Sequence, residues 1–254
     1  MMRKEHTGTP EKHRKALISL SLLEYEEELS KRIGDLKDSE VFSRILKLVD
    51  SGMLYSLHID VMRPPLIPDR SAFPTEVIRD LYVHLHDKIM LVIHLMVKEP
   101  DYLIKEIDSF IELDARPNIS LIIHREAYAS EEDVIKRLKF IKELGYKAGI
   151  GLNLPTPLTS LTDGMIKNAD MVLIMSVPMG KGGQRYDDRS SRRIRGVSER
   201  FPDKLIEVDG GINDETIRSV VEAGAKSLVI GSYVTKNTNP IEALVRLHKI
   251  LSEE

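Results

Sequence analysis

The chain has 254 residues, with 37 Lys and Arg against 40 Asp and Glu, so its formal net charge is −3. This near balance argues against a protein built mainly to bind nucleic acid, which usually carries a basic excess. The absence of Cys excludes disulfides, thiolate metal sites and a Cys nucleophile, and it fits a reducing cytoplasm.

Insertion into a membrane is also disfavoured, because the longest apolar stretches, such as residues 90–97, span about eight residues where a spanning helix needs about 20. Basic residues precede the apolar run 16–23 as they do in a signal sequence. Acidic residues follow that run at once, however, and no small-residue cleavage site is present. We therefore expect residues 1–13 to form a flexible N-terminal tail ahead of a folded, cytoplasmic domain.

Short β-branched or aliphatic runs alternate with longer stretches of helical period along the rest of the chain. The predicted strands are residues 17–20, 55–61, 90–94, 120–123, 147–152, 171–175, 205–208 and 227–230. The predicted helices include residues 102–113, 131–144, 214–223 and 240–251. Ser130 is expected to cap a helix, and Gly145 and Gly224 are expected to end helices. The stretch 24–50 is long for one helix, so we expect an additional helix or an insertion there.

Alternating strands and helices predict a parallel sheet covered by helices. Eight such units in about 240 residues suit a single-domain α/β protein, a (β/α)8 TIM barrel over residues 14–254. A doubly wound open sheet is the alternative. It would more often show a Gly-rich turn after the first strand, and residues 19–25 contain no Gly.

The ends of the predicted strands carry side chains that can ligate a metal. His58 and Asp60 are two residues apart in one strand and therefore face the same side. On its own this pair could be an incidental ion pair at a polar strand end. His94 and Asp209, however, fall at the same end of two further strands. Two imidazoles and two carboxylates would form a mixed nitrogen and oxygen site for one divalent ion, with positions left open for substrate.

Glycines gather in the loops after the last three predicted strands. Each could simply permit a tight turn. Three consecutive loops of this kind favour a phosphate site instead, because loops after the last strands of a barrel often hold a phosphate on their backbone N–H groups. The residues concerned are Gly180, Gly182, Gly183, Gly210, Gly211, Gly231 and Ser232.

With these motifs in order, the chain resembles the ribulose-phosphate 3-epimerase family from about residue 16 to residue 251. The matching segments are LHIDVM (57–62), IHLMV (93–97), HRE (124–126), GLNLPTP (151–157), VLIMSV (172–177), GKGGQ (180–184), EVDGGI (207–212) and GS (231–232). The resemblance implies a (β/α)8 barrel enzyme that interconverts D-ribulose 5-phosphate and D-xylulose 5-phosphate.

The resemblance also implies roles for particular residues. Asp60 and Asp209 match the two acid/base carboxylates, and with His58 and His94 they match the ligands of one divalent metal ion, Fe2+, Zn2+ or Mn2+. Ser19 looks like the family's substrate-contacting serine. The methionines that cover the reacting carbons would be Met62, Met96 and Met175, and the phosphate would lie on the glycine loops.

This chemistry is consistent with the residues. Inverting a carbon next to a carbonyl removes a proton from one face and returns one to the other, which two carboxylates on different strands can do. The enediolate formed in between carries negative charge that a divalent cation can stabilise. Methionine side chains would exclude water without donating stray protons.

The chain also departs from the family pattern beside the site. Arg63 and Pro64 replace an acid and a glycine after the second strand, and Lys181 lies in the phosphate loop. These changes keep open the 3-epimerisation of another ketose phosphate, such as a hexulose 6-phosphate. A non-catalytic sugar-phosphate-binding paralogue is a separate alternative, which the complete set of ligands and carboxylates disfavours. His124 and Glu126 match a family motif, for which we expect hydrogen-bonded support rather than catalysis.

The expected partners are therefore a ketose phosphate and a second copy of the chain, since barrels of this family are commonly homo-oligomers. Neither nucleic acid nor a membrane is expected to be a partner.

Overall fold

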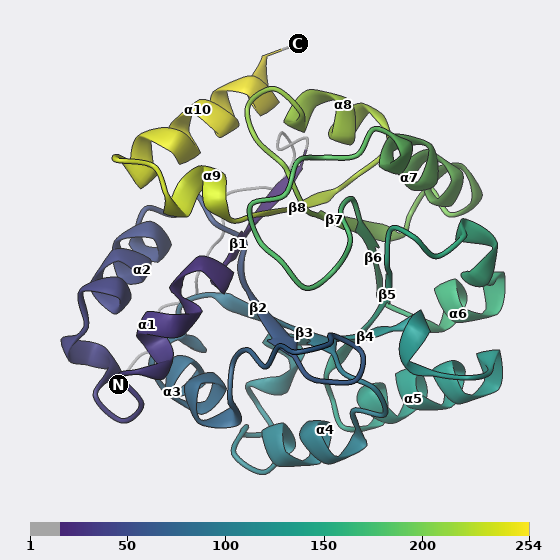
Figure 1. Ribbon diagram of the computed structural model, residues 1–254, viewed down its shortest axis with the longest axis horizontal. Coiled ribbons are helices and arrows are strands. Elements are labelled where there is room, and N and C mark those ends of the chain that lie inside the picture. The colour runs from purple at the N-terminus through teal and green to yellow at the C-terminus, as the bar shows by residue number, and fades with distance from the viewer. Residues whose placement is uncertain (1–15, 254) are drawn as a thin grey trace.

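The computed structural model describes residues 16–253, and within them eight parallel strands close into a barrel in which each strand pairs with its sequence neighbours and β8 pairs with β1 (Figure 1). The TIM-barrel prediction is thereby confirmed. The strands are β1 Leu17–Ser21, β2 Ser56–Met62, β3 Met90–Met96, β4 Ile119–His124, β5 Lys147–Leu152, β6 Met171–Met175, β7 Leu205–Asp209 and β8 Ser227–Ile230. The predicted tail, residues 1–13, lies outside the described residues.

The helices form an outer layer around this barrel (Figure 1). They are α1 Glu26–Ser30, α2 Glu40–Asp50, α3 Thr75–Leu85, α4 Asp101–Asp108, α5 Glu131–Glu143, α6 Asp163–Asn168, α7 Arg189–Arg200, α8 Ile217–Glu222, α9 Ser232–Thr235 and α10 Pro240–Ser252. None of the helices in residues 16–253 is long and apolar enough to cross a membrane.

Local signals in the sequence place several helix ends correctly. The Ser130 hydroxyl accepts a hydrogen bond from the backbone N of Asp133 at 3.1 Å and so caps α5. Gly145 and Gly224 follow helices with φ of +96° and +109°, a conformation that favours glycine. The extra helix expected within residues 24–50 is present as α1, which precedes α2.

Two predicted helices are shorter than expected, and tertiary or turn contacts explain both. α4 ends at Asp108, and the backbone N of Glu112 donates to the Tyr82 hydroxyl instead of continuing the helix. α8 begins at Ile217 rather than at residue 214, because the Asn213 side chain accepts hydrogen bonds from two backbone N–H groups and forms a turn.

Five strands, β1, β2, β3, β4 and β7, end one or two residues later than predicted, so that Ser21, His124 and Asp209 belong to strands. β2 and β3 stay paired through Asp60 with His94 and Met62 with Met96. The lower interior is filled by a small apolar cluster that includes Val92, Ile122, Met171, Leu173 and Val229. Above it, at the carboxyl ends of the strands, the interior turns polar.

Candidate active site

Four side chains from three strands converge inside the barrel. His58 Nε2 lies 3.0 Å from His94 Nδ1, which in turn lies 3.1 Å from Asp60 Oδ1 and 3.9 Å from Asp209 Oδ2. One ligand atom from each residue lies within 4.8 Å of all the others. We call these four residues the ligand cluster. Two nitrogen and two oxygen donors at this spacing could hold a divalent metal ion.

The barrel closure is what brings the ligand cluster together. His58 and Asp60 lie two residues apart on β2 and so face the same side of the strand. Asp60 pairs with His94 on the neighbouring strand β3. Asp209 ends β7, which is separated from β2 by β8 and β1. It therefore reaches the cluster across the barrel interior. The two histidines have no exposed surface.

The two carboxylates of the cluster have opposite pKa shifts. Burial opposes ionisation of Asp60, but the adjacent His58 and hydrogen bonds from both cluster histidines lower its pKa below the usual value. Burial and the negative charge of Asp60 raise the pKa of Asp209 from 3.8 to about 8. Near neutral pH, Asp60 is therefore ionised while Asp209 keeps its proton.

The two histidines also differ. Burial, helped by the neighbouring His124 and His58, lowers the pKa of His94 to about 3, although contact with Asp60 acts the other way. For His58, burial is outweighed by the carboxylates of Asp60 and Glu207, which raise its pKa above the usual value. His94 is thus a neutral imidazole, the form in which histidine binds metals.

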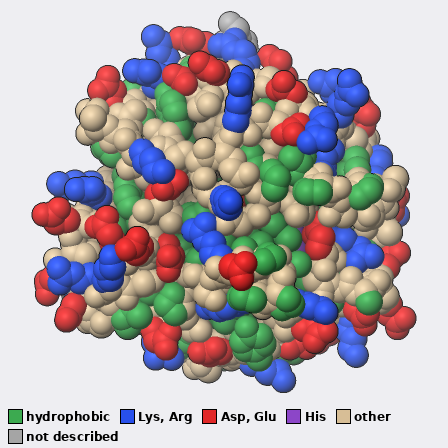
Figure 2. All heavy atoms as spheres, viewed as in Figure 1, with side chains coloured by type: hydrophobic (Ala, Val, Ile, Leu, Met, Phe, Trp, Pro, Cys, Tyr) green, Lys and Arg blue, Asp and Glu red, His purple; other side chains and the backbone are tan. Residues whose placement is uncertain are grey.

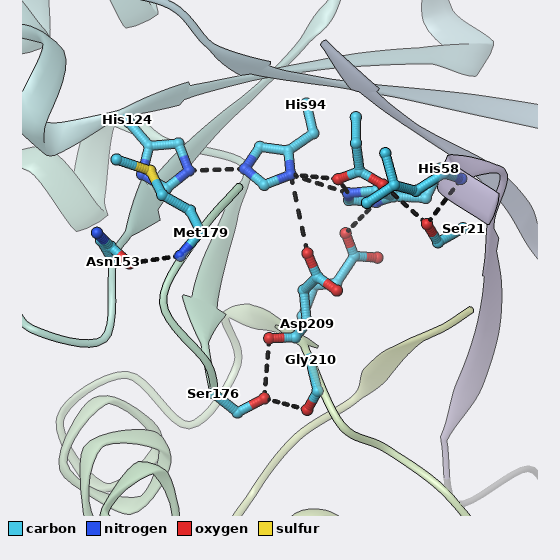
Figure 3. A network of polar contacts seen from close by, with 12 residues as sticks. Ser21, His58, His94, His124, Asn153, Ser176, Met179, Asp209 and Gly210 are labelled. Atoms are coloured by element: carbon cyan, nitrogen blue, oxygen red, sulfur yellow. Dashed lines mark hydrogen bonds and ion pairs between the residues drawn. The ribbon is translucent and has the colours of Figure 1, made fainter. Parts of the chain in front are cut away.

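A second layer of polar residues lies behind the ligand cluster, and the sequence had assigned it no catalytic role. Figure 3 shows His124, His94 and His58 in a row, with His124 Nε2 2.6 Å from His94 Nε2. His124 Nδ1 lies 3.1 Å from Glu126. On the other side, His58 Nδ1 lies 3.4 Å from Glu207, whose second oxygen accepts a hydrogen bond from the Ser227 hydroxyl. Glu207 could have been found from its spacing, since it lies two residues before Asp209 on the same strand.

A cavity of about 520 Å³ opens at the carboxyl ends of the strands, and Asp60 and Asp209 of the ligand cluster line it. His58 and His94 are fully buried and are not part of the lining among the described residues. All the other residues predicted for the site except Ser19 line it as well: Met62, Met96, Met175, Gly180, Gly182, Gly183, Gly210, Gly211, Gly231 and Ser232.

Ser19 is the one predicted site residue that lies elsewhere. Its hydroxyl is fully buried and hydrogen-bonds the Ser56 hydroxyl at 2.7 Å, deeper in the barrel. Ser21, two residues further along β1, lines the cavity and donates to Asp60 Oδ2 at 2.8 Å. The alternation of a strand puts both serines on one side, so the sequence left their depth undecided, and Ser21 takes the position expected for Ser19.

The opposite wall of the cavity is built from the glycine loops, and we call Gly180, Gly182, Gly183, Gly210, Gly211 and Gly231 the glycine wall. Gly211 shows why side chains are excluded there. A Cβ on it would lie 2.2 Å from the backbone N of Tyr186, and its φ is +66°. The Ser176 hydroxyl donates to the carbonyls of Asp209 and Gly210 and fixes the backbone between the two parts of the site (Figure 3).

Cationic side chains border the glycine wall. Lys181, Arg185 and Lys236 line the cavity, and basic side chains lie near the centre of this face in the space-filling view (Figure 2). Lys236 Nζ lies 2.8 Å from Glu24, another cavity residue, and a Cβ placed on Gly182 would lie 2.9 Å from the same carboxylate. The cavity mouth therefore carries positive charge suited to an anionic ligand.

Arg63, by contrast, is turned away from the cavity. Its guanidinium donates to the carbonyls of Met62, Ala72 and Phe73 at 2.6, 2.5 and 2.9 Å, and so it closes the loop after β2 on itself. It is absent from the cavity lining among the described residues. The change at position 63 therefore alters the support of the loop rather than the wall of the pocket.

Comparison with known proteins agrees with this geometry. A 3-keto-L-gulonate-6-phosphate decarboxylase from Vibrio cholerae aligns with a TM-score of 0.63 at 11% identity, covering 93% of this chain and 97% of that one, which shows the barrel fold alone. The ribulose-phosphate 3-epimerase of Aquifex aeolicus is 36% identical over 201 residues, 77% of this chain and 83% of that protein. That of Bacillus subtilis is 35% identical over 196 residues, 74% and 83% of the two chains.

The family model described as "Ribulose-phosphate 3 epimerase family" matches residues 37–235, which hold three members of the ligand cluster on β2 and β3, Asp209 on β7 and the whole glycine wall. The chain belongs to the ribulose-phosphate 3-epimerase family.

Proposed function

We propose that this protein is a metal-dependent ribulose-phosphate 3-epimerase that interconverts D-ribulose 5-phosphate and D-xylulose 5-phosphate by proton transfer between two carboxylates. The observation that carries the proposal is the pair Asp60 and Asp209. They reach one cavity from strands on different sides of the barrel, with carboxylate oxygens within 4.8 Å of each other. Family membership supplies the substrate class.

In the metal-free protein the two carboxylates differ in protonation. A lowered pKa keeps Asp60 ionised, the form that accepts a proton, and a raised pKa of about 8 keeps a proton on Asp209. Two acids whose environments push their pKa values apart are typical of acid/base pairs. Because the reaction runs in both directions, the residue that is the base in one direction is the acid in the other.

The ligand cluster fits a divalent cation. Its donors are two imidazole nitrogens and two carboxylate oxygens, and each histidine turns its second ring nitrogen toward a buried acceptor, as metal-binding histidines usually do. His58, Asp60, His94 and Asp209 would hold the ion. When bound, it would supply Lewis-acid stabilisation of the negative charge that develops on the substrate.

The remaining cavity residues orient and shield the substrate. We place the phosphate on the glycine wall and Ser232, with Lys181 and Lys236 close by. The sugar carbons would then lie over the two carboxylates. Met62, Met96 and Met175, each almost fully buried, exclude water from the carbon that loses its proton, and Ser21 holds the Asp60 carboxylate in place.

The direct test incubates the purified protein with Mn2+, Fe2+ or Zn2+ and ribulose 5-phosphate in deuterium oxide. We expect formation of xylulose 5-phosphate and incorporation of deuterium at C3, both lost after chelation. Binding of the sugar phosphate without exchange at C3 would overturn the proposal and would favour the non-catalytic paralogue.

A panel of ketose phosphates examines the remaining alternative. Arg63 was the residue expected to reshape the pocket for a hexulose 6-phosphate, and it contacts backbone carbonyls instead. We therefore expect the pentulose phosphate to be preferred. The choice of metal, the cytoplasmic location and the homo-oligomeric state stay predictions of the sequence.

A further inference from the structure

Both ring nitrogens of His94 have a polar neighbour, but only the neighbours of Nδ1 belong to the ligand cluster. Its Nδ1 faces Asp60 and His58, whereas its Nε2 lies 2.6 Å from the Nε2 of His124 (Figure 3). The rings of His94 and His124 are stacked at 4.9 Å with an angle of 25° between their planes. Both side chains are completely buried. A buried contact this short between two imidazole nitrogens requires one to donate and the other to accept.

The fold leaves a space shaped for the His124 ring. His124 is paired with Gly151 on the neighbouring strand β5. A Cβ on Gly151 would lie 3.1 Å from the Cε1 and Nε2 atoms of His124, closer than ordinary van der Waals contact. The glycine therefore lets the imidazole lie flat against β5, with its Nε2 directed at His94.

The far nitrogen of His124 is also occupied. Its Nδ1 lies 3.1 Å from Glu126 Oε2, and the other oxygen of that carboxylate accepts the backbone N–H of Asn153 at 2.9 Å. The Asn153 side chain in turn accepts the backbone N–H of Met179 at 3.0 Å, in the loop that leads to the glycine wall (Figure 3). An acceptor-only carboxylate thus ends the row of imidazoles.

A metal bound by His94 Nδ1 requires the His94 proton to lie on Nε2, and a neighbouring atom must accept that proton. His124 Nε2, at 2.6 Å, is placed to accept it. The Glu126 carboxylate can only accept, so it favours the His124 tautomer that carries its proton on Nδ1 and presents a lone pair at Nε2. We infer that His124 and Glu126 are positioning residues that fix the tautomer of His94 as a metal ligand. The inference rests on the proposed function only in treating the ligand cluster as a metal site.

His58 shows the simpler form of the same device. Its Nδ1 faces Glu207 directly at 3.4 Å, with no imidazole in between. For His94, the carboxylate is Glu126, and the His124 ring lies between the two. Glu126 is also connected through Asn153 to the loop before the glycine wall. His124 and Glu126 therefore also connect the ligand cluster to the loop that leads into the glycine wall.

The test measures the affinity of the metal-free, full-length protein for Mn2+ alone, from the electron paramagnetic resonance signal of the free ion. His124→Phe keeps a flat ring but removes the acceptor, and we expect the dissociation constant to rise about 10- to 100-fold. Glu126→Gln places an amide between two N–H donors, and we expect a rise of about tenfold. His124→Gln can offer a side-chain oxygen to His94 and should stay within about threefold of the wild type.

Asp108→Asn is the matched control, because Asp108 is a partly buried carboxylate that contacts Arg116 and Tyr146 far from the cavity. It should leave Mn2+ affinity unchanged. Wild-type affinity in His124→Phe, or no Mn2+ binding by the wild type, would overturn the inference. A protein that binds Mn2+ in this His124-dependent way but does not epimerise ribulose 5-phosphate would overturn the proposed function and leave the inference standing.

Discussion

The ligand cluster on β2, β3 and β7 is built from side chains, whereas the glycine wall after β6, β7 and β8 is built almost entirely from backbone. The ligand cluster uses buried imidazoles and carboxylates that have further polar residues behind them. His124 and then Glu126 lie behind His94, for example. The glycine wall uses backbone, with exposed cations such as Lys236 at its edge. Proton transfer needs particular atoms held in one orientation, whereas a phosphate can be bound by backbone N–H groups and diffuse positive charge.

Removing either acid should give the largest effect. Asp60→Asn and Asp209→Asn each take away one of the two groups that we propose to move protons, so we expect kcat to fall about 10²- to 10⁴-fold. Epimerisation of ribulose 5-phosphate measures the loss. Asp203→Asn, a change at an exposed carboxylate, is the control and should keep wild-type turnover. Full activity in either cluster variant would contradict the two-carboxylate mechanism.

A side chain in the glycine wall should disturb binding next. Gly211→Ala forces a Cβ to within 2.2 Å of the Tyr186 backbone N at a φ of +66°. We expect kcat/KM to fall about tenfold or more, mainly through KM, and the melting temperature to fall by several degrees. Gly34→Ala has a φ of +85° but open space around it, so it measures the backbone strain alone. Equal KM values for the two variants would show that the close approach at Gly211 is unimportant.

The ligand cluster should make stability depend on pH, whereas the glycine wall should not, because glycine has no ionisable side chain. The raised pKa of Asp209 means that the folded protein keeps a proton that the unfolded chain releases above pH 3.8. The stability from this group is therefore present at low pH and is lost as the pH rises toward about 8. In metal-free protein, we expect the melting temperature of Asp209→Asn to rise relative to wild type over that interval, and a constant difference would contradict the shift. His94, whose lowered pKa acts in the opposite sense, is common to both proteins.

The smallest effects are expected at the exposed edge of the glycine wall. Lys236→Met removes a cation and should raise KM by about two- to fivefold, and Glu24→Gln should lower KM by a similar factor because it frees Lys236 for the substrate. Both effects should shrink at high salt. Lys31→Met, in an exposed pair with Glu27 on α1, is the control. The decisive result is that KM changes in opposite directions in Lys236→Met and Glu24→Gln, and a change in the same direction would contradict this role of the ion pair.

The two serines of β1 show how far the sequence could be taken. Ser19 and Ser21 share one side of the strand, and only the register with β2, which pairs Ser21 with His58, reveals which of them reaches the cavity. Arg63 shows the same limit. Its position after a metal motif left open a pocket reshaped for another ketose phosphate, but its guanidinium donates to three backbone carbonyls instead.

The order of strands and helices, the two pairs of metal-binding residue types and the glycines after the last strands were all determined by the sequence. Those features depend on local periodicity and on residue chemistry. The tertiary structure alone decided that Asp209 meets Asp60 across the barrel, that Glu207 lies behind His58 and that His124 lies flat against Gly151. These contacts join residues far apart in the chain, and their geometry depends on barrel closure and strand register, which no local pattern specifies.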